Sequence, residues 1–289
     1  MTFNDDAKIN PGRVSRRGRN TGIAVGGGGG LLILGLFIVS QFLGVDLTGL
    51  AGGGTTGGET GEPLSQCTTG EAANESTDCL VAAAADSLDT YWAAELPTRG
   101  PAYHSTDIVL FTDQTNTGCG AASSATGPFY CPPDEKIYLD TAFFDELRTR
   151  FGSSGGPLAE MYVVAHEWGH HIQNISGLMD GLDLQATGPS SDSVRLELQA
   201  DCFAGAWVGA ASSTNAENGV PFLEPVTDAQ IADALSAASA VGDDRIQASQ
   251  GQVNSESWTH GSSEKRQQWF TAGLTGGSGA CNTFEVATP

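Results

Sequence analysis

Two histidines four positions apart, His166 and His170, enclose Glu167 in the segment His-Glu-Trp-Gly-His. In a helix, residues i and i+4 lie on one face, so both imidazole rings can reach one metal ion. Glu167 projects away from that line, where its carboxylate can hydrogen-bond to a water on the metal. Such a match also occurs in unrelated helices whose histidines are surface residues. The apolar flanks, Val163 to Ala165 and Ile172, favour a buried metal site.

A zinc site that hydrolyses its substrate needs a third protein ligand and an open coordination position. The segment Glu197-Leu-Gln-Ala-Asp201, in a later predicted helix, supplies two acids at i and i+4. We expect Glu197 to be the third ligand and Asp201 to accept the free ring N–H of a ligand histidine, which fixes its orientation. A solvated acidic face is the alternative. It fits poorly because buried acids without partners are costly and the neighbours are apolar: Leu196, Leu198, Ala200, Phe203 and Ala204.

An HExxH motif followed by ExxxD resembles the gluzincin group of metallopeptidases. The chain is more closely similar to the bacterial neutral zinc metallopeptidase family, whose members carry an N-terminal membrane segment. The resemblance covers most of residues 64–289 and implies a zincin-like fold, Zn²⁺ on His166, His170 and Glu197, and Glu167 as the base. The matching stretches are Gly127–Pro132, Ile137–Asp140, Val164–Gln173, Glu197–Gly205 and Trp258–Ser262, with Arg266 and Trp269–Phe270.

The expected chemistry is peptide hydrolysis by a zinc metalloendopeptidase. Zinc would lower the pKa of its water toward ~7, and Glu167 would take the water proton and pass it to the leaving amine. The oxyanion needs a further donor, for which His260 in the segment Trp-Thr-His-Gly is the candidate. A loop or cap histidine is an equally good interpretation of His260. Tyr103 and Tyr162 are weaker candidates for the donor.

Two other histidines, His104 and His171, could touch the metal, but three ligands are already assigned. We therefore expect both to be structural or surface residues. By analogy between folds, we expect the strand predicted at Lys136 to Asp140 to be the sheet edge along which an extended peptide lies.

The main alternative function is a catalytically inactive or latent membrane-tethered homologue that binds peptides or proteins. Its mark would be a lost ligand or base, and none of these residues is missing. A metal-stabilised structural domain would favour a closed four-ligand site rich in cysteine, and the cysteines here are dispersed.

Charge excludes nucleic acid as a partner. The net charge is -21, with a pI of about 4.3, whereas phosphate binding requires a basic surface. The expected partner is a peptide or protein substrate. Nothing in the sequence indicates the oligomeric state.

Five of the 13 basic residues lie in the first 19 positions, and no charged residue occurs from Thr21 to Val45. We expect residues 1–20 to form a basic cytoplasmic tail and residues 21–45 a transmembrane signal anchor. Residues 46–63, rich in Gly and Thr, are expected to be a flexible linker. Residues 64–289 are expected to form the zinc metallopeptidase domain, which would lie outside the cytoplasm in a single-pass membrane protein. The alternative is secretion after signal cleavage near Ala51.

Local signals predict a mostly helical α+β domain with a small sheet. Strands are expected at 107–111 and 136–139, with a loop from 115 to 127. Helices are expected at 77–94, 143–151, 157–176, 192–211, 228–241 and 263–272, several of them from N-cap residues. Six cysteines after an export segment suggest three disulfides, expected as Cys67–Cys79, Cys119–Cys131 and Cys202–Cys281. Reduced, buried cysteines are the alternative.

Overall fold

The structure, a computed structural model, describes residues 2–18 and 61–289. Its larger sheet has five strands in the order β2-β1-β3-β7-β6. The strands β1, β3 and β7 are parallel, and β2 and β6 pair antiparallel at the two edges. Their bounds are β1 Val14–Arg16, β2 Glu62–Pro63, β3 Asp107–Phe111, β6 Phe129–Cys131 and β7 Lys136–Asp140. A separate antiparallel hairpin joins β4 (Gln114–Thr117) to β5 (Gly120–Ser123).

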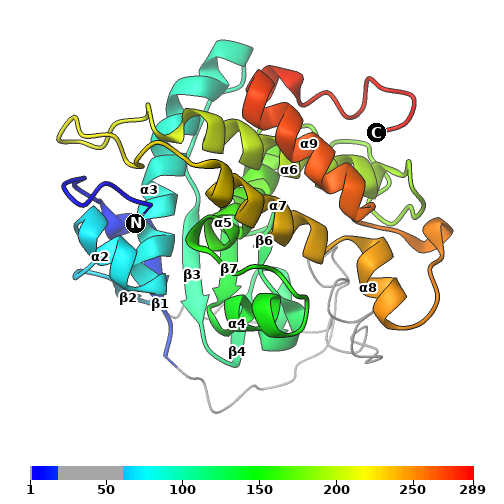
Figure 1. The fold of residues 1–289 in the computed structure, drawn as a ribbon, viewed down its shortest axis with the longest axis horizontal. Coiled ribbons are helices and arrows are strands. Elements are labelled where there is room, and N and C mark those ends of the chain that lie inside the picture. The colour runs from blue at the N-terminus through cyan, green and yellow to red at the C-terminus, as the bar shows by residue number, and fades with distance from the viewer. Residues whose placement is uncertain (1, 19–60) are drawn as a thin grey trace.

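Helices make up most of the remaining regular structure. The α-helices are α2 Gly70–Glu75, α3 Thr77–Glu95, α4 Ala142–Thr149, α5 Pro157–Ile175, α6 Asp192–Ala211, α7 Asp228–Ala240, α8 Asp243–Ser249 and α9 Ser263–Gly276. Short 3-10 helices lie at Pro11–Arg13, Leu96–Arg99, Ser124–Thr126, Ser255–Ser257 and Ser278–Ala280. Helix α5 packs against β6 and β7 as well as against α3, α6 and α7, so it is central to the domain (Figure 1).

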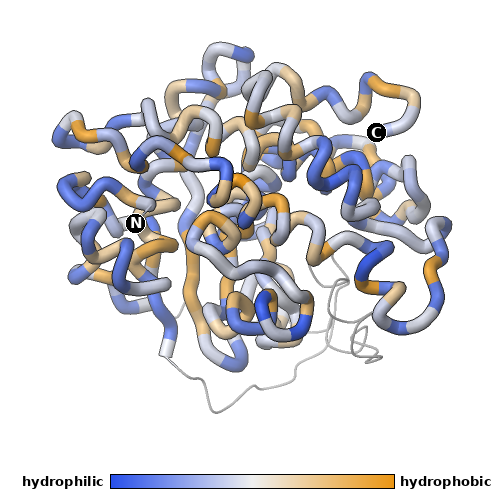
Figure 2. Tube along the Cα trace, in the orientation of Figure 1, coloured by the Kyte–Doolittle hydropathy of each residue, from blue (hydrophilic) through white to orange (hydrophobic). Residues whose placement is uncertain are grey.

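The central strands are buried because they carry nearly continuous apolar residues. Residues Ile108 to Phe111 of β3 and Ile137 to Leu139 of β7 are all 2% exposed or less. Figure 2 shows the resulting hydrophobic run along the sheet, with hydrophilic residues toward the outside. Burial on both faces is typical of parallel strands covered by helices.

Glycines allow the helices around α6 to approach closely. A Cβ at Gly169 of α5 would lie 3.1 Å from the Ala200 Cα, and one at Gly273 of α9 would lie 1.8 Å from the Cys202 carbonyl oxygen. Any side chain at Gly273 would therefore push α9 away from α6. These contacts fix α6 between the two helices whose side chains it meets in the candidate site.

All three expected disulfides are present: Cys67–Cys79, Cys119–Cys131 and Cys202–Cys281. None of the six cysteines is free. The first bond ties α3 to the loop before α2, the second ties the β4–β5 hairpin to β6, and the third ties α6 to the segment after α9. The alternative of reduced cysteines is thus not what the structure shows.

The long helices begin and end within a few residues of their expected positions, and the α+β class is confirmed. The predicted loop at 115–127 instead contains the β4–β5 hairpin. The prediction that Lys136 to Asp140 forms the sheet edge is wrong, because β7 lies between β3 and β6. The edge strand is β6, which is only three residues long and fully buried, between Pro128 and Pro132. Its shortness and lack of alternation conceal it in the sequence.

Residues 2–18 also differ from expectation. They pack onto residues 61–289 instead of forming a separate tail, and the expected linker ends in β2. The expected signal anchor at 21–45 lies outside the described residues. Within the parts of the chain that are described, none of the helices has both the length and the apolar character needed to cross a bilayer.

Candidate metal centre

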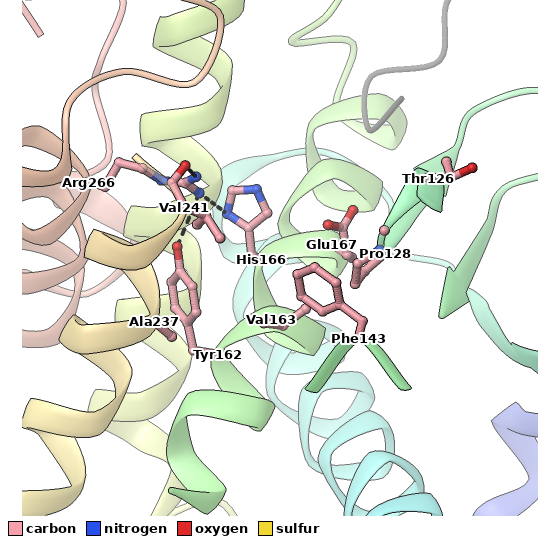
Figure 3. Close-up of a pocket in the computed structure, with 11 residues that line it drawn as sticks. Thr126, Pro128, Phe143, Tyr162, Val163, His166, Glu167, Ala237, Val241 and Arg266 are labelled. Carbon is pink, nitrogen blue, oxygen red and sulfur yellow. Dashed lines mark hydrogen bonds between the residues drawn. The ribbon is translucent and has the colours of Figure 1, made fainter. Parts of the chain in front are cut away.

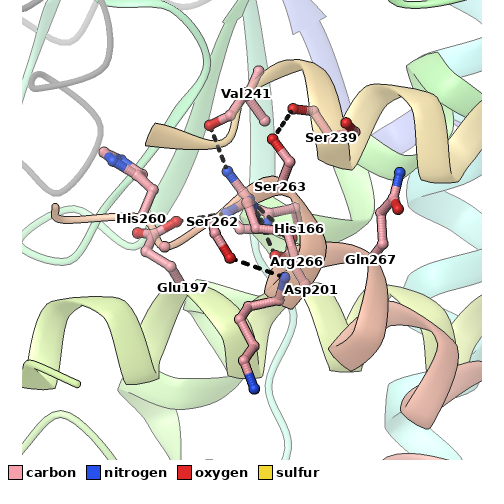
Figure 4. A network of polar contacts seen from close by, with 12 residues as sticks. His166, Glu197, Asp201, Ser239, Val241, His260, Ser262, Ser263, Arg266 and Gln267 are labelled. Carbon is pink, nitrogen blue, oxygen red and sulfur yellow. Dashed lines mark hydrogen bonds and ion pairs between the residues drawn. The ribbon is translucent and has the colours of Figure 1, made fainter. Parts of the chain in front are cut away.

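Helices α5 and α6 bring the three expected ligands together. His166 and His170 lie on one face of α5, and Glu197 faces them from α6 (Figure 4 shows His166 and Glu197). The carboxylate of Glu197 lies 3.0 Å from His166 Nε2 and 3.4 Å from His170 Nε2. One potential ligand atom from each of the three residues lies within 4.8 Å of the other two, and all three residues are buried. This cluster could hold one metal ion.

The other ring nitrogen of each histidine is already hydrogen-bonded. His166 Nδ1 donates to Asp201 Oδ1 at 2.8 Å, and His170 Nδ1 donates to Gln173 Oε1 at 2.9 Å. Gln173 is held in turn, because its amide donates to the Leu196 carbonyl at 2.8 Å. Hydrogen bonds at Nδ1 fix the tautomer that leaves both Nε2 atoms free to bind a metal.

Asp201 also binds Arg266, which extends from α9 and is 1% exposed. The guanidinium donates through Nε to Oδ2 at 2.8 Å and through Nη2 to Oδ1 at 2.9 Å. Its Nη1 donates to the Val241 carbonyl at 3.2 Å, and the Tyr162 hydroxyl donates to Asp201 and accepts from Nη2. A buried charge pair of this kind needs further hydrogen bonds, and each of the three guanidinium nitrogens has at least one acceptor here.

The site favours ionised carboxylates at both acids of α6. Burial alone would raise the pKa of Glu197, but His170, His260 and a hydrogen bond from His166 hold that pKa well below its usual range. Burial likewise opposes the charge of Asp201, and Arg266 and His166 overcome it and lower the pKa of that carboxyl. Both acids are therefore negative at neutral pH. This charge suits Glu197 as a candidate metal ligand and Asp201 as the acceptor of the His166 N–H.

Glu167 lies on the side of α5 that faces a pocket (Figure 3). Burial raises the pKa of Glu167, while His170 and His166 and a hydrogen bond from the Tyr130 backbone N–H favour its charged form. A buried carboxyl group beside a cluster that could hold a metal ion is placed to accept and return a proton. Apolar side chains form most of the pocket wall: Pro128, Phe143, Val163, Ala237 and Val241.

His260 lies beside this centre, in the loop that precedes α9, and Figure 4 shows its ring next to Glu197. The loop is built around Asp243 of α8. Asp243 Oδ2 accepts the backbone N–H groups of Thr259 at 2.9 Å, His260 at 2.7 Å and Gly261 at 2.9 Å. Asp243 Oδ1 lies 3.5 Å from His260 Nδ1, which is also 2.8 Å from the Thr259 hydroxyl. The ring is thus held on its Nδ1 side.

The remaining candidates lie outside the metal cluster. His171 is fully buried and bonds to the Tyr130 hydroxyl at 3.1 Å and the His104 carbonyl at 2.8 Å. The ring of His104 is exposed and 2.8 Å from Glu135. Both fit the structural or surface role expected of them. The Tyr103 hydroxyl donates to Asp89 at 2.6 Å, so it is not directed at the cluster.

Two residues of the site escaped the sequence-based prediction. Gln173 is three positions after His170, a spacing that places the two side chains together on a helix and could have indicated the contact. Asp243 has no comparable local signal, because it meets His260 only through the fold of α8 and the loop before α9.

The arrangement fits an open metal site better than a closed one. A structural zinc site is typically closed by four protein ligands, whereas a catalytic site keeps a position for water. Within the described residues, the cluster offers three ligands, and a carboxyl group that is not one of them lies next to it. The site is therefore of the kind that the sequence resemblance to zinc metallopeptidases implies.

Comparison with known families agrees with this class. Residues 4–284 match the family model described as "Putative neutral zinc metallopeptidase", and the chain belongs to that family. The family description implies zinc as the metal. The match begins at residue 4, so residues 4–18 belong to the region that the family model covers.

The relatives found carry no described activity. The chain is 52% identical to the "Uncharacterized protein Rv2575" of Mycobacterium tuberculosis over 230 residues, which cover 78% of this chain and 77% of the relative. It is 39% identical to the "Uncharacterized protein YpfJ" of Escherichia coli over 272 residues, covering 89% of this chain and 87% of the relative. No solved structure matches the chain.

Proposed function

We propose that the protein is a zinc metalloendopeptidase whose catalytic base is Glu167. The observation that carries this proposal is the position of a buried carboxyl, that of Glu167, next to the His166–His170–Glu197 cluster and at an apolar pocket. The donor set of two imidazoles and one carboxylate suits zinc and leaves room for a water and a substrate oxygen.

Bound zinc would supply a water with a pKa near ~7 and a Lewis acid for the substrate carbonyl. Glu167 would accept a proton from the attacking water and return it to the leaving amine. His260, held on its Nδ1 side by Asp243 and Thr259, would present Nε2 to the oxyanion of the substrate. Asp201 and Gln173 would keep the two ligand rings in place throughout the reaction.

A peptide substrate would pass the segment just before β6, because β6 itself is fully buried. The chain before β6, residues Thr126 to Pro128, lines the same pocket as Glu167. A substrate beside Thr126 to Pro128 would bring its backbone past the base, while a side chain next to the cleaved bond enters the pocket. The apolar walls favour a hydrophobic side chain.

The proposed location is outside the cytoplasm. Three disulfides close all six cysteines, and such bonds persist mainly in oxidising compartments. The disulfides are compatible with either an anchored or a secreted enzyme.

Reversible metal removal tests the proposed class. Treating the purified full-length protein with 1,10-phenanthroline should abolish casein cleavage, and adding zinc after the chelator is removed should restore it. Cleavage that survives metal removal, verified by metal analysis, would show that the activity does not depend on this centre. A zinc-loaded protein that cleaves none of a broad set of proteins would favour the peptide-binding homologue instead.

A further inference from the structure

The N-terminal segment, residues 2–18, is built into the core of the domain. Four of its apolar side chains are buried in the main hydrophobic cluster: Phe3, Ala7, Ile9 and Val14. Its backbone is bonded over long sequence distances, since the Asn4 N–H donates to the Phe222 carbonyl at 2.9 Å. Strand β1 completes the sheet by pairing with both β2 and β3. Without this segment, those apolar surfaces and the edge of β3 would meet water.

Glycines occur where the segment passes close to the rest of the chain. A Cβ at Gly70 would lie 1.8 Å from the Asn4 carbonyl oxygen, and one at Gly61 would lie 2.7 Å from the Ser15 Oγ. Neither glycine has a positive φ, so a left-handed turn does not explain them. The contact with the N-terminal segment does, because any larger residue at Gly70 would exclude it.

The basic residues of the segment bind the acidic domain. Arg16 Nε donates to Asp78 Oδ2 at 2.6 Å, and Lys8 Nζ lies 2.9 Å from Glu217. Arg13 and Arg17 also have partners: Arg13 lies 3.5 Å from Asp89, and Arg17 lies 5.7 Å from the centre of the Tyr138 ring. From sequence alone, basic residues before an apolar stretch predict a cytoplasmic segment. In the fold, these four residues instead bind side chains of the domain.

The chain leaves and re-enters the domain at one place. Arg16 of β1 is paired with Glu62 of β2, so residues 18 and 61 follow and precede strands that are hydrogen-bonded neighbours. One membrane crossing between them would put β1 and β2 on opposite sides of the bilayer. Two crossings need about 40 apolar residues, whereas the uncharged run covers only residues 21–45.

We propose that residues 2–18 lie on the same side of any membrane as the metal centre, so that a single crossing between residues 18 and 61 is incompatible with the folded enzyme. The proposed topology differs from the one that the basic residues suggest in the sequence, a cytoplasmic tail with an external domain. It is independent of the proposed catalytic activity.

Thiol labelling of the full-length protein in intact bacterial cells tests the proposal. All six native cysteines are in disulfides, so Lys8→Cys and Glu217→Cys would each introduce a single reactive thiol. Their side chains are 59% and 76% exposed, and losing a surface ion pair costs little. A membrane-impermeant maleimide should give the same result for both variants. Either both are labelled in intact cells, or both are labelled only after the cells are permeabilised. Labelling of Glu217→Cys in intact cells, with Lys8→Cys labelled only after permeabilisation, would overturn the proposal.

Cross-linking gives an independent measurement in the same membranes. The double variant Lys8→Cys/Glu217→Cys should be joined within one chain by a short bis-maleimide, as detected by mass spectrometry. The matched control is Lys8→Cys/Val286→Cys, because Val286 is exposed and its carbonyl accepts a hydrogen bond from Arg195 of α6. The chain ends marked N and C lie on opposite sides of the view (Figure 1). A cross-link in the first pair alone supports the proposal. Equal yields, or none in either pair, would contradict it.

Discussion

Asp201 accepts a hydrogen bond from His166 Nδ1 at 2.8 Å and thereby sets the orientation of that ring. The same carboxylate neutralises Arg266, which is buried on α9. One residue thus links the order of the metal site to the packing of α6 against α9. The two effects can be separated experimentally because one concerns metal affinity and the other stability.

Replacing Asp201 with Asn should weaken zinc binding by about 10- to 100-fold, because the His166 ring loses its charged acceptor. It should also destabilise the metal-free protein by about 3–5 kcal/mol, since Arg266 would keep its charge without a counter-ion. Zinc competition with a chelator and denaturant unfolding measure the two quantities. The control Asp228→Asn, at the exposed start of α7, should change neither. Unaltered zinc affinity in Asp201→Asn would show that Asp201 does not orient a ligand.

His260 should act on the transition state without binding the metal. His260→Gln should lower kcat by about 100-fold with little change in KM or zinc content, as expected for the loss of one oxyanion donor. Asp243→Asn should also lower kcat, because the loop that carries His260 is held less firmly. The loss should be smaller than in His260→Gln, because the His260 side chain is still present. If kcat is unchanged in His260→Gln, the histidine is a loop residue, as its alternative interpretation holds.

Asp86 predicts a pH dependence of stability. Burial raises its pKa to about 6, although the Asn10 backbone N–H, which donates to it, opposes the shift. Because the folded-state pKa exceeds the unfolded value, the folded state binds the proton more tightly, and the associated stability is lost as pH rises from about 4 through 6. Asp86→Asn should remove that part of the decline. The measurement is the free energy of unfolding of both proteins between pH 4 and 8. The same pH dependence in the variant and the wild type would be inconsistent with the raised pKa.

The pocket beside Glu167 predicts a preference for substrates. Ala237 lines it from α7 and is fully buried. Ala237→Leu would fill part of the space, so cleavage next to large apolar residues should fall relative to cleavage next to Ala or Gly. Peptide-library profiling measures the change, with the exposed Ala229→Leu on the same helix as control. An unaltered profile would mean that the pocket does not hold a substrate side chain.

The helices and the metal cluster were predictable because their signals are local. Pro157 suits the first turn of α5, Thr227 and Gln230 form the capping box of α7, and the HExxH and ExxxD spacings each place two residues on one helix face. These patterns need no knowledge of the tertiary fold. The same locality made the short-loop disulfides at Cys67 and Cys119 reasonable expectations.

The features that escaped prediction depend on contacts between distant segments. Strand β1 is only Val-Ser-Arg, and it is a strand because β3, more than 90 residues later, lies beside it. Its two neighbouring charges, Arg16 and Arg17, look like part of a soluble tail until Asp78 and the Tyr138 ring are in place. Asp243 likewise gains its role only when the loop before α9 folds around it.

The most direct test of the central claim measures zinc content and casein cleavage in the same preparations of the wild type and Glu167→Gln. The amide keeps the size of the side chain but removes the base, and Glu167 is not one of the three ligands. We predict about one zinc per chain in both proteins and cleavage by the wild type alone. A wild type without zinc, or a zinc-loaded Glu167→Gln that cleaves as fast as the wild type, would contradict the account.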